Sequence, residues 1–140
     1  MLPLRLVIDT NVLVSAALKP ESLQRTALIV AITKPARLYV SRQILEEYAG
    51  VLSRPELAIR KGLRLQLLQM IANRSHVVHP SRRIEAAKDP DDDIFIECAD
   101  AARADFLITG NRRHFPAFWK CTKIVTPREF VALAAPHLIR

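Results

Sequence analysis

The chain is poor in the small-residue and sulfur motifs on which several large enzyme classes depend. Its only glycines are Gly50, Gly62 and Gly110, which lie too far apart to form a phosphate-cradling loop. No GxSxG nucleophile elbow is present, and the two cysteines and four histidines form no CxxC or other zinc-ligand pattern. P-loop nucleotide hydrolysis, serine-elbow hydrolysis and zinc-centred catalysis are therefore poor interpretations of this sequence.

Long hydrophobic runs are also missing. Every apolar segment is far shorter than the ~20 residues that a membrane span needs. A strand-like segment begins almost at Met1, so we expect no secretory leader, and Cys98 and Cys121 fit free thiols in a reducing compartment. Because half of the 140 residues are hydrophobic, we expect one globular, cytoplasmic domain spanning residues 1–140.

Negative charge is scarce and unevenly spread. The formal net charge is +7 and the sequence pI is about 10.0, which favours a polyanionic partner, with nucleic acid first. Basic charge that serves only solubility stays open as the alternative. Against this background Asp89, Asp91, Asp92 and Asp93 crowd together at one place in the chain. An acidic focus in a basic protein suits metal-dependent chemistry on a phosphate backbone.

Strand-like and helix-like segments alternate along the chain. The expected strands are residues 4–8, 37–40, 76–79, 106–108 and 123–125. The expected helices are residues 11–18, 22–34, 41–54, 56–74 with a break at Gly62, 90–102, and a last one that begins at the capping box of Thr126. This alternation predicts an α/β fold, a three-layer α/β/α sandwich with a mostly parallel sheet.

Asp9 stands at the end of the first expected strand, in the segment Leu4-Arg5-Leu6-Val7-Ile8-Asp9-Thr10-Asn11. In open α/β sheets, ligands bind outside the carboxyl ends of the strands, so a carboxylate at this point is a candidate site residue. The residues alone leave open that Asp9 only caps the following helix.

Helical periodicity separates Glu47 from its neighbour Glu46. Glu47 interrupts the apolar stripe of Ile44 and Val51, so its charge needs a partner, whereas Glu46 falls on a polar face and is expected to be solvated. Glu47 is therefore the candidate site residue of this pair.

The same argument separates two acidic residues of the later helix. Asp92 falls on the side that borders the core, whereas Asp93 shares a face with Glu97 and Asp100, which we expect to be exposed to solvent. Asp89 and Asp91 precede or begin the helix, where acidic residues suit the helix dipole, and this structural role explains them better than a role in the site. Asp92 is therefore the stronger candidate.

Several carboxylates around one crevice repel one another and raise one another's pKa unless a cation is present. Oxygen ligands without a histidine or cysteine cluster favour Mg²⁺ or Mn²⁺. Arg112 and Arg113 follow the turn that begins at Thr109 and are candidates to bind substrate phosphates, with a solvated turn as the alternative. His114 fits a structural or substrate-edge role better than that of a general base.

Four segments together resemble the PIN domain family, in particular the toxin-like group related to the VapC ribonucleases of toxin–antitoxin pairs. They are Val7-Ile8-Asp9-Thr10-Asn11-Val12-Leu13, Ser41 through Glu47-Tyr48, Asp89-Pro90-Asp91-Asp92 leading to Ala99, and Leu107-Ile108-Thr109-Gly110-Asn111 with Phe115. The segments span nearly the whole chain, and their order and spacing make the resemblance fairly specific. It implies a parallel five-stranded sheet of order 3-2-1-4-5, an acidic metal site and endoribonuclease activity.

The resemblance also implies individual roles. Asp9, Glu47 and Asp92 match the family's first three acids and would hold Mg²⁺ or Mn²⁺ directly or through water. The family's fourth acid falls on Asn111, where this chain departs from the pattern and brings no negative charge. Asn11 would hydrogen-bond Asp9. The catalytic residues implied in this way are Asp9, Glu47, Asp92, Thr109 and Asn111.

We therefore expect a Mg²⁺- or Mn²⁺-dependent endoribonuclease that hydrolyses RNA phosphodiester bonds as the toxin of a type II toxin–antitoxin pair. RNA, an antitoxin protein and a second copy of the chain in a homodimer are the expected partners. A PIN-fold module that binds RNA or antitoxin with weak or lost catalysis is the alternative, motivated by Asn111. A phosphoaspartyl protein fits less well, because no lysine follows the last strand and Asn11 stands where a phosphatase needs aspartate.

Overall fold

The structure is a computed structural model that describes residues 3–139, and its centre is a six-stranded sheet of order β3-β2-β1-β4-β6-β5. The strands are β1 (Arg5–Ile8), β2 (Arg37–Val40), β3 (His76–Val77), β4 (Phe106–Ile108), β5 (Phe118–Trp119) and β6 (Thr122–Val125). The α-helices are α1 (Thr10–Leu18), α2 (Leu23–Ala31), α3 (Arg42–Leu52), α4 (Lys61–Arg74), α5 (Asp93–Ala102) and α6 (Pro127–Ala134). Short 3₁₀ helices are η1 (Pro55–Leu57), η2 (Pro90–Asp92), η3 (Arg112–His114) and η4 (Pro136–Leu138).

The α/β prediction is confirmed, with one more strand than expected. The parallel strands β3, β2, β1, β4 and β6 follow the expected order 3-2-1-4-5 when they alone are numbered. The sixth strand, β5, pairs antiparallel with β6 at the sheet edge. Its two residues are too few to show any periodicity, so the sequence pattern could not reveal it.

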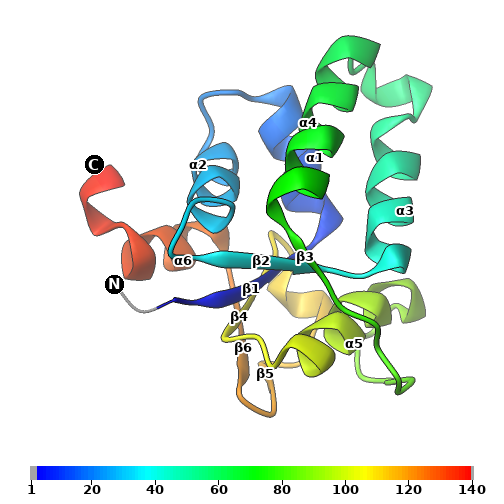
Figure 1. Cartoon of the computed structure of the whole chain (residues 1–140), viewed down its shortest axis with the longest axis vertical. Coiled ribbons are helices and arrows are strands. Elements are labelled where there is room, and N and C mark those ends of the chain that lie inside the picture. The colour runs from blue at the N-terminus through cyan, green and yellow to red at the C-terminus, as the bar shows by residue number, and fades with distance from the viewer. Residues whose placement is uncertain (1–2, 140) are drawn as a thin grey trace.

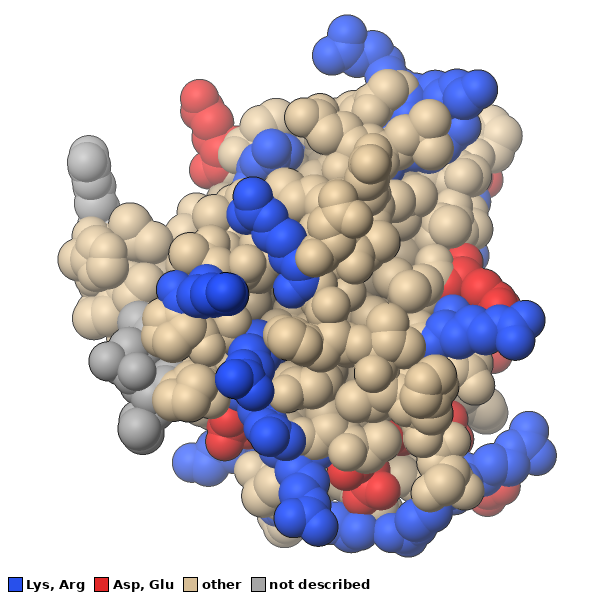
Figure 2. Space-filling view, in the orientation of Figure 1, with Lys and Arg blue, Asp and Glu red and all other residues tan. Residues whose placement is uncertain are grey.

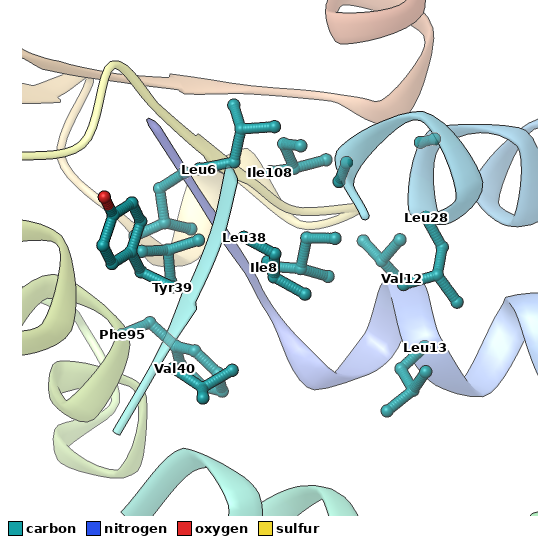
Figure 3. Packing of buried hydrophobic residues seen from close by; sticks show 14 of the residues in the cluster. Leu6, Ile8, Val12, Leu13, Leu28, Leu38, Tyr39, Val40, Phe95 and Ile108 are labelled. Carbon is teal, nitrogen blue, oxygen red and sulfur yellow. The ribbon is translucent and has the colours of Figure 1, made fainter. Parts of the chain in front are cut away.

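The helices form layers on both faces of the sheet. Helix α5 contacts β1, β2 and β4 on one face, whereas α1 to α4 stand on the other (Figure 1). Ile8 and Leu38 lie on the side of Val12 and Leu28, and Phe95 of α5 lies across the sheet from them (Figure 3). Coverage of both faces explains why β1 and β2 are continuous apolar runs rather than alternating ones.

Several helix boundaries follow from their capping residues. Ser22, Ser41 and Thr126 each accept a backbone hydrogen bond from the first turn of the helix that follows, as their sequence positions predicted. The expected break at Gly62 is wrong, because Gly62 lies within α4. The chain turns instead at Ala58, which has a left-handed φ of 52° after the 3₁₀ helix at Pro55–Leu57.

No helix in the described part of the chain is both long and apolar enough to cross a membrane. Both cysteines are free thiols; Cys98 is buried in α5 and Cys121 is exposed. Because the parallel strands β1 and β4 end at the same edge, the residues that follow them, Asp9 and Thr109, lie side by side.

Candidate active site

Asp9 and Thr109 form the floor of the candidate site. The register pairs Ile8 with Ile108, and the Asp9 amide then donates to the Ile108 carbonyl at 2.9 Å. The Thr109 hydroxyl donates to Asp9 Oδ2 at 2.7 Å, and both residues are buried. Asp9 precedes α1, but its side chain makes no capping hydrogen bond, so capping does not explain the carboxylate.

Glu47 is held over the same strand end by its neighbour Tyr48. The Tyr48 side chain is fully buried and its hydroxyl donates to the carbonyl of Ile8, the residue before Asp9. The hydroxyl of Thr10 donates to Glu47 Oε2 at 2.8 Å. Glu47 and its neighbour Tyr48 are therefore bound to the residues on the two sides of Asp9, Glu47 to Thr10 and Tyr48 to Ile8.

Glu46 behaves as a surface charge, as predicted from the helix face. It is exposed and pairs with Arg42 one turn earlier at 3.0 Å. An exposed pair of this kind contributes little to stability, about 0.3–0.5 kcal/mol at most. Glu46 and Glu47 are adjacent in sequence, and only Glu47 lines the acidic pocket described below.

Asp92 and Asp89 approach from the start of α5. Asp89 Oδ1 accepts from the Asp91 amide at 3.0 Å and so caps the 3₁₀ turn at Pro90–Asp92. The backbone amide of Lys88 donates to the carbonyl of His114 at 2.9 Å, which ties this segment to the turn after β4. Asp92 is half-buried, with its Oδ2 3.8 Å from His114 Nδ1.

The expected solvent exposure of Asp93 is wrong. Only 8% of Asp93 is exposed, and its Oδ1 accepts from the amides of Ala86 and Ala87 at 3.1 and 2.8 Å. Glu97 likewise accepts from the Ile84 amide at 3.1 Å. The acidic face of α5 therefore binds the irregular segment that precedes the helix, a partner that periodicity alone does not reveal.

The carboxylates converge on one pocket of about 460 Å³ at the carboxyl edge of β1 and β4. Its polar lining includes Asp9, Thr10, Asn11, Ser15, Glu47, Arg54, Asp89, Asp92, Asn111 and His114. Burial is the main cause that raises the pKa of Asp9, and the charge of Glu47 acts in the same direction. Burial, followed by the charges of Asp9 and Asp89, raises the pKa of Asp92 to about 6.

Several pocket residues were not assigned to the site from the sequence, and Arg54 is the one that brings a positive charge. Arg54 lines the pocket together with Val51, and both follow Glu47 at helical spacing, so extending that face would have found Arg54. His114 also lines the pocket and stands beside Asp92, which agrees with a residue at the edge of the site. Arg54 places a positive charge beside the carboxylates.

Of the polar residues at the turn after β4, some line cavities and others bind neighbouring parts of the protein. Asn111 lines both the acidic pocket and a neighbouring groove of about 860 Å³, which Arg113 also lines. Arg112 is bound to Glu129 of α6 at 2.6 and 2.8 Å, so its charge is already paired. Asn11 does not take the expected bond to Asp9; its Oδ1 accepts from the Gly110 amide at 3.1 Å and holds the turn.

The chemistry of the donor set fits a hard divalent cation. Asp9, Glu47 and Asp92 offer carboxylate oxygens, and their mutual repulsion is the kind that a cation relieves. Within residues 3–139, no three His, Cys, Asp or Glu side chains stand close enough to enclose an ion by themselves. Binding through few direct ligands and several waters is the mode that Mg²⁺ prefers.

Comparison with known proteins assigns the chain to a family. Residues 5–113, most of the chain, match the PIN domain family. The chain belongs to the PIN domain family. PIN domains are generally nucleases, and they generally use divalent metal ions.

The chain is also similar to two individual proteins. An uncharacterized protein of Methanocaldococcus jannaschii, MJ1680, is 28% identical, with 91% of this chain and 90% of that protein covered. A chain in the crystal structure of VapBC2 from Rickettsia felis bound to a DNA fragment from their promoter superposes with a TM-score of 0.61. That match has 17% identity and covers 87% of this chain and 98% of the other, so it supports the PIN fold.

Proposed function

We propose that this PIN domain protein is a Mg²⁺- or Mn²⁺-dependent endoribonuclease. The observation that carries the proposal is the convergence of Asp9, Glu47 and Asp92, from three distant segments, on one pocket at the carboxyl edge of the sheet. Carboxylates gathered without a cation destabilise one another, so their common placement in a basic protein is better explained by function than by stability.

In this proposal Asp9, Glu47 and Asp92 hold the cation, directly or through water. When bound, the cation supplies a Lewis acid that lowers the pKa of water and neutralises charge on the phosphodiester. Thr109 fixes one oxygen of the Asp9 carboxylate, and Thr10 fixes one oxygen of Glu47. These hydroxyls hold the carboxylates in place before substrate arrives, which is the usual role of residues behind the ligands.

The remaining pocket residues bind and orient the substrate. Arg54 and His114 border the carboxylates and can bind the phosphate being cleaved. Asn111 positions water or substrate through its amide, and exposed Arg113 binds a neighbouring phosphate in the adjoining groove. Arg112 contributes less than expected from the sequence, because Glu129 already accepts its hydrogen bonds.

We propose RNA as the substrate and an antitoxin protein as a partner, so that the chain acts as the toxin of a type II pair. The similarity in fold to a chain of the VapBC2 complex supports this assignment. The sequence pI of about 10.0 supports a polyanionic substrate. A homodimer that places two acidic pockets along one basic surface remains part of the proposal.

The direct test is cleavage of single-stranded RNA by the purified protein. We expect cleavage with Mg²⁺ or Mn²⁺, complete loss in excess EDTA, and recovery when the cation is restored. Asp9→Asn should remain inactive at every cation concentration. Cleavage that persists in EDTA, or that Asp9→Asn retains, contradicts the proposed function.

A second candidate is a binding module with weak catalysis, which Asn111 favours because it lacks the charge of the family's fourth acid. Asn111→Asp restores that charge at nearly constant volume. We expect this variant to melt at a lower temperature than the parent in EDTA, since another carboxylate faces Asp9 and Asp92. We expect Mg²⁺ or Mn²⁺ to stabilise it more than the parent, and its activity to be at least as high.

Thermal melts across a range of cation concentrations, paired with RNA cleavage by both proteins, test this expectation. Asn111→Ala is the matched control, because it removes the amide without adding charge. Equal cation stabilisation of Asn111→Asp and the parent would mean that position 111 does not face the ion. A parent protein that binds RNA without cutting it, together with an active Asn111→Asp variant, would favour the binding module.

A further inference from the structure

A second groove lies at the amino edge of the sheet, opposite the acidic pocket. It has a volume of about 780 Å³ and is lined by residues 32–37 and 73–76 together with Pro3. These segments are the loop that enters β2 and the turn from α4 into β3. We call this surface the amino-edge groove.

The amino-edge groove carries positive charge with no acidic residue in its described lining. Lys34, Arg37 and Arg74 line it and are exposed, and His76 adds a fourth basic group when protonated. The two stretches that form its walls belong to longer segments, residues 22–45 and 57–84, that contain no aspartate or glutamate. Figure 2 shows Lys and Arg side chains following one another from the top to the bottom of the view.

The cations of the amino-edge groove differ in this respect from Arg42, Arg112 and Lys120, whose charges are paired. Arg42, Arg112 and Lys120 each pair with a carboxylate at 3.0 Å or less. Within residues 3–139, neither Lys34, Arg37 nor Arg74 forms an ion pair, so their charge is not offset locally. Unpaired cations that surround a concave surface concentrate positive potential there.

The walls of the groove are held by the sheet. The Arg37 amide donates to the Leu4 carbonyl at 2.8 Å, and the ring of His76 lies 5.4 Å from that of Tyr39. Among described side chains, the Ser75 hydroxyl is the one buried polar atom that lacks a hydrogen-bond partner. The groove wall thus contains a hydroxyl whose hydrogen-bonding capacity the protein itself does not use.

We propose that the amino-edge groove binds the sugar–phosphate backbone of an RNA strand at a distance from the cleavage site. The choice of RNA rests on the proposed ribonuclease function, because an RNA substrate presents a series of phosphates to several cations at once. Strand β1 separates the two sites by four residues, about 13 Å of extended chain. An RNA strand must pass around the edge of the sheet to occupy both sites. The groove therefore increases the affinity for long RNA and not for short RNA.

The test is a triple variant, Lys34→Gln/Arg37→Gln/Arg74→Gln. Its control is Lys19→Gln/Arg60→Gln/Arg128→Gln, which removes the same charge from three exposed residues outside the groove. Binding of fluorescently labelled RNA is measured in EDTA, so that no cleavage is needed, over a range of salt concentrations. Thermal melts of each protein verify folding, and the single variant Arg74→Gln provides a milder change.

We expect the groove variant to bind an RNA of about 30 nucleotides roughly tenfold more weakly than the control variant does. The slope of log K against log salt should fall by roughly 2, since each lost phosphate contact accounts for about 0.7. Binding and Mg²⁺-dependent cleavage of an RNA of about 5 nucleotides should match those of the control. Arg74→Gln should show the same pattern with a smaller effect.

Equal weakening by the groove and control variants would show that only net charge matters and would overturn the proposal. An unchanged affinity for long RNA, combined with weaker binding of polyglutamate, would overturn it in favour of an acidic polypeptide. Because binding is measured without cleavage, the result tests the groove even if the protein proves not to cleave RNA. Conversely, if the protein cleaves short RNA normally but its groove does not bind RNA, the groove proposal fails and the ribonuclease proposal stands.

Discussion

Glu47→Gln is expected to abolish RNA cleavage, while Glu46→Gln leaves it within about twofold of the parent. Glu47 lines the acidic pocket, and replacing its carboxylate removes a negative charge from the proposed cation site. We expect a loss on the order of 10²-fold or more in kcat/KM, because phosphodiester hydrolysis depends on the bound cation. Glu46 is exposed and pairs only with Arg42.

The two variants form a matched pair, since each removes one charge from adjacent positions of the same helix. The glutamine at position 47 can still accept the hydrogen bond from Thr10, so we expect α3 to stay in place. Cleavage rates measured over a range of Mg²⁺ or Mn²⁺ concentrations separate weaker cation binding from a slower reaction. Similar losses for Glu46→Gln and Glu47→Gln would show that the helix-face assignment does not describe the site.

Asp92 and Asp93 are expected to differ in the kind of damage that their replacement causes. Asp92→Asn should lower cleavage on the order of 10²-fold without lowering stability, because Asp92 lines the pocket and its charge is opposed by Asp9 and Asp89. Asp93→Ala should retain cleavage at low temperature but lose stability. It leaves the partly buried amides of Ala86 and Ala87 without an acceptor, at a cost of about 1–3 kcal/mol.

The pH dependence of stability gives the Asp92 prediction a second measurement. The pKa of Asp92 is raised to about 6 in the folded protein, so the folded state holds its proton more tightly than the unfolded state does. The resulting stabilisation is present below the unfolded pKa of 3.8 and is lost as the pH rises through about 6. Asp92→Asn cannot lose a proton, so its melting temperature in EDTA should exceed that of the parent increasingly from pH 4 to pH 7.

Thermal melts in EDTA at a series of pH values, together with cleavage rates well below the melting temperature, test both members of the pair. Restoring Mg²⁺ should stabilise the parent more than Asp92→Asn, since the cation binds the folded carboxylates. A parallel pH dependence for parent and Asp92→Asn would contradict the crowded environment assigned to Asp92. Loss of cleavage without loss of stability in Asp93→Ala would place that residue in the reaction instead.

Local sequence patterns were sufficient for most of the scaffold and for its principal acids. The apolar run before Asp9, the serines and threonine that cap α2, α3 and α6, and the alternation of strands with helices each reflect interactions within a few residues. The face of α3 also separated Glu47 from Glu46, because helical geometry determines which side of a helix meets the core. These features required no knowledge of distant partners.

Tertiary structure decided which polar groups are already paired. Asp93 is buried because the segment at 84–87 folds back over α5, and Arg112 is engaged because α6 brings Glu129 beside it. Strand β5 exists only through its pairing with β6. In each case the partner lies on another element of the fold.

The same reason applies to the two grooves at opposite edges of the sheet. Lys34 and Arg74 line one groove because β2 and β3 pair. Asp9 and Asp92 line one pocket because α5 packs against β1. The sequence by itself determined the five parallel strands, most of the helices and the face of α3 that carries Glu47. Only the folded chain determined which of its charges are neutralised by one another and which remain unpaired. Pairing depends on distances between segments that sequence spacing does not encode.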